Sequence, residues 1–494
     1  MFKNGVSFIL LYYFVFCIES SHSAECSNQT VNFDASHTDY YIISNSTDLD
    51  AKICKYKFTV PAYFVPTIIF SKVTLTANNT ITTRQFSEYG GVKTYKISVD
   101  AQMTLAPVDF TIELNLSQKT TADSFNILIS VKDCTPSQTG GSFIVTKELG
   151  KLIDSYRIVA NSVLSQTFDN QNPPAKNYTI KIVLFTDGNL IYNLLMRVFV
   201  YDQGVYKGSL LDVYDAQNSH QICHGSQFSI VNSLSSSIGT FTVLISQKHD
   251  WNENQVLAVP PPPSNTSAHY SATNGLTVYH VISNPIYYST PTIIQQITFV
   301  EGNGSMTIYA GCVTGDQEAK RIAFITPSTA ANYENLEVFG RCRTYVLTKG
   351  VLKWNVFNYY PATFNRPIGS KGVIMSETYP YINENTALLG NFLIQAPDMA
   401  FNENIIVTYE VADIGVNVSF HIQQYVEGGS SFNKTLSATD IGTSFTSMST
   451  FQQYIKFAVP QNSEGFLVRF TVTSSSCSTT FEAVFAVCLL SLIF

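Results

Sequence analysis

Strict alternation of apolar and polar residues constrains the fold of this chain more than any other feature. In residues 108–117 every second residue is apolar and the residues between are polar. The same pattern recurs in residues 405–411, 416–423 and 466–473. A period of two places one face of a β-strand in a core and the other in water. The pattern therefore predicts antiparallel sheets with one buried face and one solvated face.

The composition agrees with an all-β fold. Aromatic residues make up 13% of the chain, with 34 Phe and 28 Tyr, and charged residues only 13%. Aromatic side chains favour strands over solvent-exposed helices. Helical periodicity is scarce, and the spacing of Leu149, Leu152, Ile153 and Tyr156 suggests one short helix in residues 147–157. We therefore predict an all-β protein built of tandem antiparallel β-sandwich modules.

A weak internal repeat also suggests several similar modules. Residues 56–61 read YKFTVP and residues 455–460 read IKFAVP, and these two segments form the best pair. In each, a short apolar strand stops at a proline, which cannot donate to a strand ladder. The sequence PTII occurs twice, at Pro66 and at Pro291. Looser versions of the first motif occur at residues 392–397, 322–327 and 256–260.

Domain boundaries are predicted from composition. A chain of 494 residues has room for three or four domains. Prolines 260–263 favour an extended spacer, and further boundaries are expected near residues 139–141 and 349–350. The predicted organisation is a signal peptide (1–23), a β-sandwich (24–138), a second β-sandwich module (139–258), a Pro-rich linker (259–268), a β module (269–349), a divergent β-sandwich (350–474) and a removed C-terminal signal (475–494).

The N-terminal sequence is typical of a secretory signal peptide. Lys3 precedes an apolar run at residues 6–18, which is shorter than the roughly 20 residues that a membrane-spanning helix needs. Ser21 and Ser23 suit cleavage before Ala24, and cleavage after Ala24 is the alternative. A second alternative is an uncleaved anchor. The signal peptide predicts an extracellular protein.

The C-terminal sequence predicts a glycosylphosphatidylinositol (GPI) anchor. Small residues at 474–478 and a short polar stretch precede a 12-residue apolar tail at residues 483–494, with no basic residue after it. Ser474 and Ser475 are the expected attachment sites. The protein would then be held at the outer leaflet of the plasma membrane, on the cell surface. The alternative is that the tail is the last strand of the last domain.

Cysteines and sequons fit an oxidising compartment. An even number of cysteines remains once the two terminal signals are removed, which predicts disulfides. Proximity in sequence favours Cys26–Cys54 and Cys312–Cys342, while the other two either pair or stay free. The six are Cys26, Cys54, Cys134, Cys223, Cys312 and Cys342.

N-glycosylation sequons are about as frequent as chance would give, but a glycosylated Asn must face solvent. The nine candidates are Asn28, Asn45, Asn78, Asn115, Asn177, Asn265, Asn303, Asn417 and Asn433.

Residues 26–134 carry a family resemblance. They combine an N-terminal Cys26, a Tyr-rich stretch, the sequence CKYKFTVPA from Cys54 and an alternating closing strand. This segment resembles the nematode CUB-like domain family, and residues 392–477 look like a divergent copy. The resemblance implies CUB-like, jelly-roll-like β-sandwiches in secreted or GPI-anchored surface proteins, linked to innate immunity and membrane rafts. Many CUB domains bind calcium, but no acidic set matches here, so no metal or cofactor is predicted.

Catalytic motifs are missing from the sequence. It contains no H-E-x-x-H, G-x-S-x-G, Walker A or G-x-G-x-x-G motif. His220, Cys223 and His224 could bind zinc, but a secreted Cys223 is more often half of a disulfide. The carboxylates do not show the facing pair that a glycosidase needs, and solvated loop positions explain them better; examples are Asp187, Asp202, Asp212 and Asp215. We predict no catalytic residue.

Aromatic residues in loops are the candidate binding residues. The segments 358–361 and 379–383 combine Tyr with Pro and Asn, and Tyr287–Tyr288 and Tyr359–Tyr360 could stack on sugars. A net charge of −7 without a Lys/Arg cluster argues against nucleic acid. We expect a non-catalytic, GPI-anchored binding or coat glycoprotein whose ligands are cell-surface, glycan or microbial-surface molecules. The alternative is a secreted hydrolase whose catalytic residues converge only in three dimensions.

Overall fold

The chain divides into two compact units. The first comprises Met1–Ile144, Ile153–Ile182 and Thr186–Val243, and the second comprises Val145–Leu152, Val183–Phe185 and Leu244–Phe494. The computed structural model describes residues 29–43, 53–76, 78–116, 120, 122–135, 138–143, 145–158, 162–166, 178–185, 189–216, 222–223, 228–233, 241–247, 250–251, 255–284, 291–357, 368–382, 388–395, 405–425, 431–447 and 452–474.

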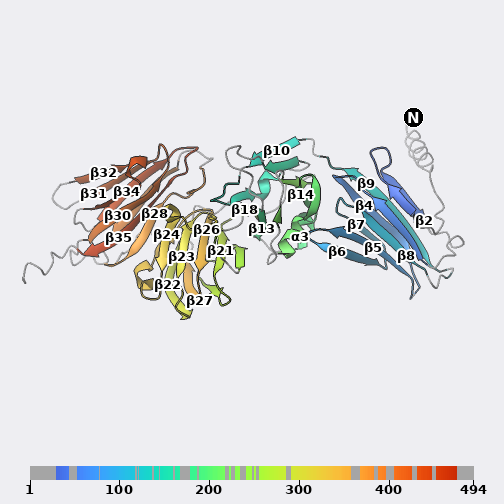
Figure 1. The fold of residues 1–494 in the computed structure, drawn as a ribbon, viewed down its shortest axis with the longest axis horizontal. Coiled ribbons are helices and arrows are strands. Elements are labelled where there is room, and N and C mark those ends of the chain that lie inside the picture. The colour runs from blue at the N-terminus through green and yellow to red at the C-terminus, as the bar shows by residue number, and fades with distance from the viewer. Residues whose placement is uncertain are drawn as a thin grey trace, which may run out of the picture. The chain divides into compact units, whose positions relative to one another are not determined.

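The first module is a β-sandwich within the first unit (Figure 1). One sheet has the order β1 (Gln29–Asn32), β3 (Ile53–Thr59), β8 (Phe110–Asn115), β5 (Thr80–Ser87) and β6 (Gly91–Ile97). The other has the order β2 (Asp39–Ile43), β9 (Ser124–Asp133), β4 (Phe64–Thr74) and β7 (Ala101–Thr104). Phe58 and Ile112 from the first sheet and Ile42 and Ile129 from the second lie in one buried apolar cluster. The core therefore lies between the two sheets.

The second module follows in the chain. One sheet has the order β10 (Gln138–Phe143), β12 (Ser162–Gln166), β17 (Phe228–Asn232), β14 (Val198–Asp202) and β15 (Val205–Ser209). The other has the order β11 (Lys151–Asp154), β18 (Phe241–Gln247), β13 (Tyr178–Leu184) and β16 (Ile222–Cys223). Its helical elements are α2 (Asn189–Leu195), α3 (Leu210–Asp215) and η1 (Ser155–Arg157).

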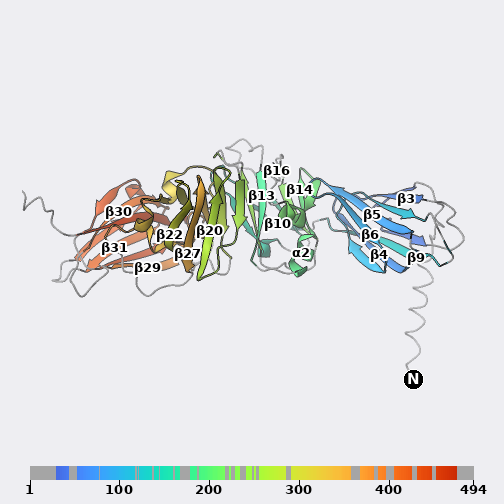
Figure 2. The ribbon, with the colours of Figure 1, turned by 90° about the horizontal axis from the view of Figure 1, so that it is seen from below.

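The third module belongs to the second unit, where Figure 2 shows β20, β22 and β27 side by side. One sheet has the order β19 (Gln255–Val259), β21 (Thr277–Ile282), β26 (Cys342–Leu347), β23 (Met306–Ala310) and β24 (Arg321–Ile325). The other has the order β20 (Thr266–Ala272), β27 (Gly350–Phe357), β22 (Thr292–Glu301) and β25 (Leu336–Val338). Two short 3-10 helices complete it, η2 (Glu318–Lys320) and η3 (Ala330–Tyr333).

In the described residues, the fourth module has two four-stranded sheets. One has the order β28 (Lys371–Met375), β35 (Phe466–Ser474), β30 (Ile405–Ile414) and β33 (Ser444–Thr446). The other has the order β29 (Leu388–Gln395), β34 (Gln452–Val459), β31 (Ser419–Tyr425) and β32 (Ser431–Leu436), with η5 (Ala438–Asp440) after β32.

All four modules share one topology. When the strands are renumbered within each module, the first three have one sheet of order 1-3-8-5-6 and one of order 2-9-4-7. The first strand pairs parallel with the third in each case, as β1 with β3, β10 with β12 and β19 with β21. Among the described residues, the fourth module has the same two orders without strand 1. The all-β prediction is confirmed, and the repeat is much clearer in topology than in sequence.

The topology shows which sequence repeats are structurally equivalent. Pro66 lies in β4 and Pro291 directly precedes β22, and both strands are the fourth of their module. The PTII repeat therefore marks equivalent positions. The better-looking pair does not, because residues 56–61 begin in a third strand while residues 455–460 begin in β34, an eighth strand. The structural counterpart of Tyr56–Thr59 in the fourth module is β29, which contains the looser match from Phe392.

Two predicted module boundaries are wrong. The Pro-rich segment 259–268 is not a linker between modules, because it joins β19 to β20 within the third module. Residues 349–350 are not a boundary either. Gly350 begins β27, which pairs with both β20 and β22 in the middle of a sheet. The third module therefore occupies residues 255–357, and proline composition misled the prediction because prolines end strands as readily as they separate domains.

Burial follows the predicted alternation at most positions, but Val416 is exposed and Leu467 is buried. In β8, Phe110, Ile112 and Leu114 are buried while the intervening residues are not. Val416 is 74% exposed because it lies in the turn before β31. The expected helix in residues 147–157 is wrong apart from the three residues of η1, because Lys151–Asp154 forms β11.

Candidate functional site

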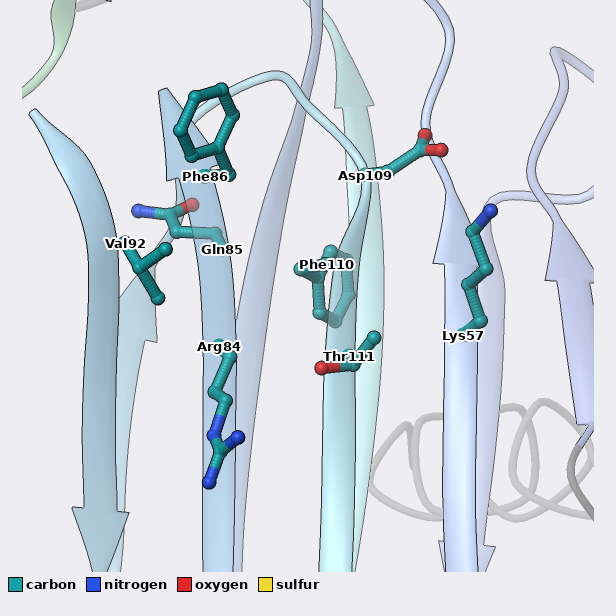
Figure 3. Close-up of a pocket in the computed structure, with 8 residues that line it drawn as sticks. All are labelled: Lys57, Arg84, Gln85, Phe86, Val92, Asp109, Phe110 and Thr111. Carbon is teal, nitrogen blue, oxygen red and sulfur yellow. The ribbon is translucent and has the colours of Figure 1, made fainter. Parts of the chain in front are cut away.

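An open hollow of about 210 Å³ lies on the outer face of the first module (Figure 3). It spans β3, β8, β5 and the start of β6, all in one sheet. The residues that line it are Lys57, Arg84, Gln85, Phe86, Val92, Asp109, Phe110 and Thr111. Their pattern mixes cations, a carboxylate, a hydroxyl and exposed apolar side chains.

Strand register places the polar side chains of this hollow in rows. Lys57 in β3 pairs with Thr111 in β8, and Thr111 pairs with Arg84 in β5. Successive residues of a strand point to opposite faces. Phe58 and Phe110, which neighbour Lys57 and Thr111 in sequence, are therefore turned inward, and their rings stack with centroids 4.7 Å apart. The apolar core thus fixes which side chains reach the surface.

A second row lies two residues along the strands. Lys55 pairs with Glu113, Glu113 with Thr82, and Thr82 with Lys96. Together the two rows bring four exposed cations to this sheet, Lys55, Lys57, Arg84 and Lys96, and we call them the basic face. None of the four forms an ion pair or a hydrogen bond with another described residue. Their positive charge is therefore available to a ligand.

Apolar side chains border the basic face at one end. Phe86 and Val92 pair across β5 and β6 and are 61% and 67% exposed. The nearby polar groups are already engaged, since Asp109 accepts a hydrogen bond from the Val60 amide at 3.0 Å. The side-chain oxygen of buried Gln85 accepts one from the Ala106 amide at 3.1 Å. The face therefore offers free cations beside an exposed aromatic ring on a rigid sheet.

The basic face could not be recognised from the sequence. Its four cations are spread over residues 55–96, so they form no Lys/Arg run. They gather only because β3, β5 and β6 belong to one sheet. The alternation in β3 and β6 does show which residues point outward, but the strand order that makes them neighbours is not readable from alternation.

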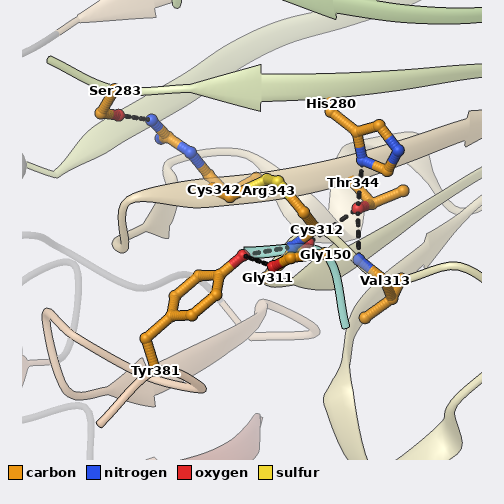
Figure 4. Close-up of a disulfide and its surroundings, with 10 residues drawn as sticks. All are labelled: Gly150, His280, Ser283, Gly311, Cys312, Val313, Cys342, Arg343, Thr344 and Tyr381. Atoms are coloured by element: carbon orange, nitrogen blue, oxygen red, sulfur yellow. Dashed lines mark hydrogen bonds between the residues drawn. A yellow bond between two sulfur atoms is a disulfide. The ribbon is translucent and has the colours of Figure 1, made fainter. Parts of the chain in front are cut away.

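Three buried residues resemble a metal site but are not available as one (Figure 4). The ligand atoms of His280, Cys312 and Cys342 lie within 4.8 Å of one another. The two sulfurs are joined in a disulfide, which leaves no thiolate to bind a cation. His280 is fully buried, with its Nδ1 3.0 Å from the Thr344 hydroxyl. This cluster supports the fold of the third module.

The interpretation of the single carboxylates as solvated loop positions is wrong for Asp202 and Asp212, which are both buried. Asp212 is buried and completes the capping box of α3, where it accepts hydrogen bonds from the amide of the N-cap residue Ser209 at 2.8 Å and from the Ser209 hydroxyl at 3.0 Å. It also forms an ion pair with Lys93 of the first module. Asp202 is buried and Asp215 is exposed, while Asp187 lies outside the described residues. Asp212 therefore has a structural role.

Two other groups bring a serine to a histidine, Ser419 to His421 and Ser36 to His37, and both lie on open surfaces. The Ser419 hydroxyl is 2.5 Å from His421 Nε2, while His421 Nδ1 is 2.9 Å from the Thr435 hydroxyl. In the turn 34–37, Asp34 accepts hydrogen bonds from Ser36, which lower the pKa of Asp34 to about 2. Neither group lies in the hollow of the first module.

Among the described residues, the loop tyrosines that were predicted to bind a ligand contribute to the fold instead. Tyr379 is fully buried, so residues 379–383 do not present it to a ligand. The hydroxyl of Tyr381 accepts a hydrogen bond from the Cys312 amide at 3.0 Å and donates one to the Gly150 carbonyl at 3.2 Å, which ties it to the disulfide region. The remaining candidates lie outside the described residues: Tyr287, Tyr288, Asn358, Tyr359, Tyr360, Pro361 and Asn383.

The disulfide predictions are confirmed for one pair. Cys312 and Cys342 are bonded. Cys54 is also disulfide-bonded, but the predicted partner Cys26 lies outside the described residues. Cys134 is a buried free thiol, so of the two alternatives left open for it, pairing is wrong and staying free is the outcome. It packs with Phe199 and Val231 against one sheet of the second module, whereas Cys223 lies on β16 in the other sheet.

The proposed zinc group cannot be assembled from what is described. His220 and His224 lie outside the described residues, and only the backbone of Cys223 is described, in β16. The predicted GPI attachment sites are also only partly described. Ser474 is the last residue of β35, and Ser475 lies outside the described residues.

Most described sequons are accessible. Asn115 is half-buried at the end of β8, and Asn28, Asn45 and Asn177 lie outside the described residues. The exposed ones are Asn78, Asn265, Asn303, Asn417 and Asn433.

Comparison with known proteins leaves the chain without an assigned family. Within the described part of the chain, no helix is long and apolar enough to cross a bilayer. No family model matches the sequence. No curated protein matches it either.

Solved structures give weak likenesses. The CUB1-EGF-CUB2 domains of rat MASP-1 align at a TM-score of 0.17 and 9% identity, over 44% of this chain and all of that one. The human MASP-1/3 fragment gives 0.17 and 8% identity, over 42% and 99%. The extracellular region of zebrafish Gpr126/Adgrg6 gives 0.19 and 9% identity, over 93% and 54%. TM-scores this low do not indicate a shared fold, so the fold is defined here by the strand topology alone.

Proposed function

We propose that this protein is a non-catalytic extracellular glycoprotein that acts as a binding or coat module. In this proposal it is held at the cell surface by a GPI anchor, binds glycan or microbial-surface ligands and takes part in innate immune defence. The observation that carries the binding role is the basic face with Phe86 beside it. Four cations that pair with no residue in the described part of the chain, next to an exposed aromatic ring, suit ligand binding better than they suit stability.

The absence of an assembled catalytic group in the described residues favours this proposal over a hydrolase. A hydrolytic site needs a nucleophile, a base and a stabilising donor around a shared cavity. Ser419 and His421 meet only the first two requirements, on the exposed surface of β31. His280 has a hydroxyl neighbour but is fully buried.

A binding screen tests the proposed function. The secreted chain covering residues 24–474 is applied to glycan arrays and to intact microbial cells, and bound ligands are recovered and examined for cleavage. We expect saturable binding with the ligand recovered intact. Cleavage of a bound glycan, abolished by Ser419→Ala, would instead establish the hydrolase. Binding to no glycan or microbial surface would overturn the proposal.

A separate experiment tests the anchor. Phosphatidylinositol-specific phospholipase C should release the full-length protein from intact cells, and a chain that lacks residues 483–494 should appear in the medium. Full-length protein that is soluble and ends at Phe494 would contradict the anchor without affecting the binding role.

A further inference from the structure

We propose that the basic face binds an anionic polysaccharide, one that carries sulfate or carboxylate groups along its chain. This inference rests on the proposed function and names the ligand class for the same site. Lys57 and Arg84 would bind two anionic groups, and Phe86 would pack against a sugar ring. The argument uses strand spacing, charge and the composition of the face.

Strand geometry sets the spacing of the cations. Neighbouring strands in a sheet lie about 4.8 Å apart. Lys57 and Arg84 are separated by one strand, β8, so their backbones are about 10 Å apart. Lys55 and Lys96 lie one row further along, about 7 Å away. Anionic groups on successive units of a polysaccharide can reach such cations without bending the chain.

The groups between the cations suit a sugar. Thr111 lies between Lys57 and Arg84, and Thr94 pairs with Arg84 on the other side, so hydroxyls alternate with cations along the row. Hydroxyls and cations together match the hydroxyls and anions of a charged sugar chain. Phe86 adds an apolar surface of the kind on which a sugar ring packs.

Charge argues against a continuous polyanion such as duplex DNA. Glu113 lies in the second row between Lys55 and the Thr82–Lys96 pair, and it forms no ion pair with a described residue. The chain as a whole has a net charge of −7. A closely spaced phosphate backbone would meet repulsion from Glu113 within the face. A polymer with sparser charges avoids Glu113.

The sequon at Asn115 limits where a polysaccharide could cross the basic face. It lies on the same outer face of β8 as Thr111 and Glu113, and it pairs with Ile53 and Thr80. An N-glycan at Asn115 would cover that end of the sheet, whereas Phe86 and Val92 mark the open end. The polysaccharide should therefore cross the face near Phe86.

The experiment compares matched variants of the full ectodomain. Binding to immobilised heparin, fully desulfated heparin and a polyuronate is measured across a range of salt concentrations. The test variants are Lys57→Gln/Arg84→Gln and Phe86→Ala. The control variant is Lys349→Gln/Lys456→Gln, which removes the same charge from exposed sites in other modules. Circular dichroism on each variant checks that the fold is unchanged.

The inference predicts a distinct result for each variant. Lys57→Gln/Arg84→Gln should weaken binding by about tenfold or more and flatten its salt dependence, because two charge-assisted contacts are lost. Phe86→Ala should weaken binding with the salt dependence unchanged. Lys349→Gln/Lys456→Gln should bind as the unmodified protein does.

Other outcomes would overturn the inference, and they separate it from the proposed function. Equal losses in the test and control charge variants would mean that the attraction is general. Equal binding to duplex DNA or to phosphatidylserine vesicles would show unspecific attraction to anions. Binding to neutral glycans only would overturn the anionic ligand and leave the proposed function standing. Binding to nothing would overturn both.

Discussion

Arg469 in β35 donates a hydrogen bond to the carboxylate of Glu318 in η2 at 3.3 Å, and so joins the fourth module to the third. The same guanidinium binds the Arg321 carbonyl at 2.9 Å and pairs with Glu410 in β30 at 3.0 Å. Val373, Met375 and Leu467 of the fourth module also belong to the apolar core of the third. The two modules therefore share part of the third module's core within the second unit, while the fourth module also has a core of its own.

Replacing Arg469 should destabilise both modules together. Arg469→Gln removes the ion pairs and leaves Glu318 and Glu410 without this partner, at a cost of about 1–2 kcal/mol. Urea denaturation followed by limited proteolysis should show one shifted transition for residues 255–474. Arg469→Lys, as a control, should recover part of the loss. A fourth module that unfolds first while the third remains folded would contradict the shared core.

Asp123 should make the first module sensitive to acid. Burial acts to raise the pKa of Asp123, but hydrogen bonds from the amides of Thr120 and Thr76 and from Asn79 outweigh it and lower the pKa to about 2. The folded state therefore favours the carboxylate over its ordinary pKa of 3.8. This stabilisation is complete above pH 3.8 and is lost as the pH falls towards 2.

The measurement is thermal unfolding of Asp123→Asn and of the unmodified protein at a series of pH values from about 7 down to about 2. The substitution should cost about 2 kcal/mol at pH 7, and the difference should shrink as the pH approaches 2. Asp215→Asn, an exposed carboxylate in another module, is the control and should have little effect. A deficit for Asp123→Asn that stays constant with pH would show that the charge is irrelevant.

The sequence predicted which residues of a strand lie in the core of a module. It did not predict which strands lie side by side in a sheet. Alternation alone identified Phe110, Ile112 and Leu114 as buried, because a sheet buries every second residue. Strand order depends on contacts between residues far apart in sequence. Lys57 and Arg84 therefore lie on one face only because β8 pairs with both of their strands, and no local pattern in the sequence indicates this. Helix prediction failed at Leu152 because pairing within a sheet overrode local periodicity.

Gly350 should tolerate no side chain. Its φ is +87°, and a Cβ would lie 1.9 Å from the Glu301 carbonyl oxygen. Gly350→Ala should therefore destabilise the third module by roughly 3 kcal/mol or more, since both strain and a backbone clash oppose it. Gly442→Ala is a matched control with φ +78° and no atom within 4 Å of the added Cβ, so it should cost only about 1 kcal/mol. Equal unfolding temperatures for the two variants would contradict the clash.

Cys134 should resist modification in the folded protein. Burial raises the pKa of its thiol, which lowers the thiolate fraction, and the side chain packs among apolar residues. Iodoacetamide at pH 7.5 should label Cys134 slowly in the native state and rapidly in denaturant, as peptide mass spectrometry can measure. Cys134→Ala should cost about 1 kcal/mol through lost packing. A Cys134–Cys223 peptide in a non-reducing digest would contradict the free thiol.

The Cys312–Cys342 disulfide also determines how the third module would respond to a pulling force. The bond closes a loop of 30 residues between β23 and β26. Tension along the chain passes through the sulfurs and leaves that loop slack, even after the surrounding sheets have separated. Unfolding of this module by force should therefore lengthen the chain by roughly 100 Å less than it would after reduction.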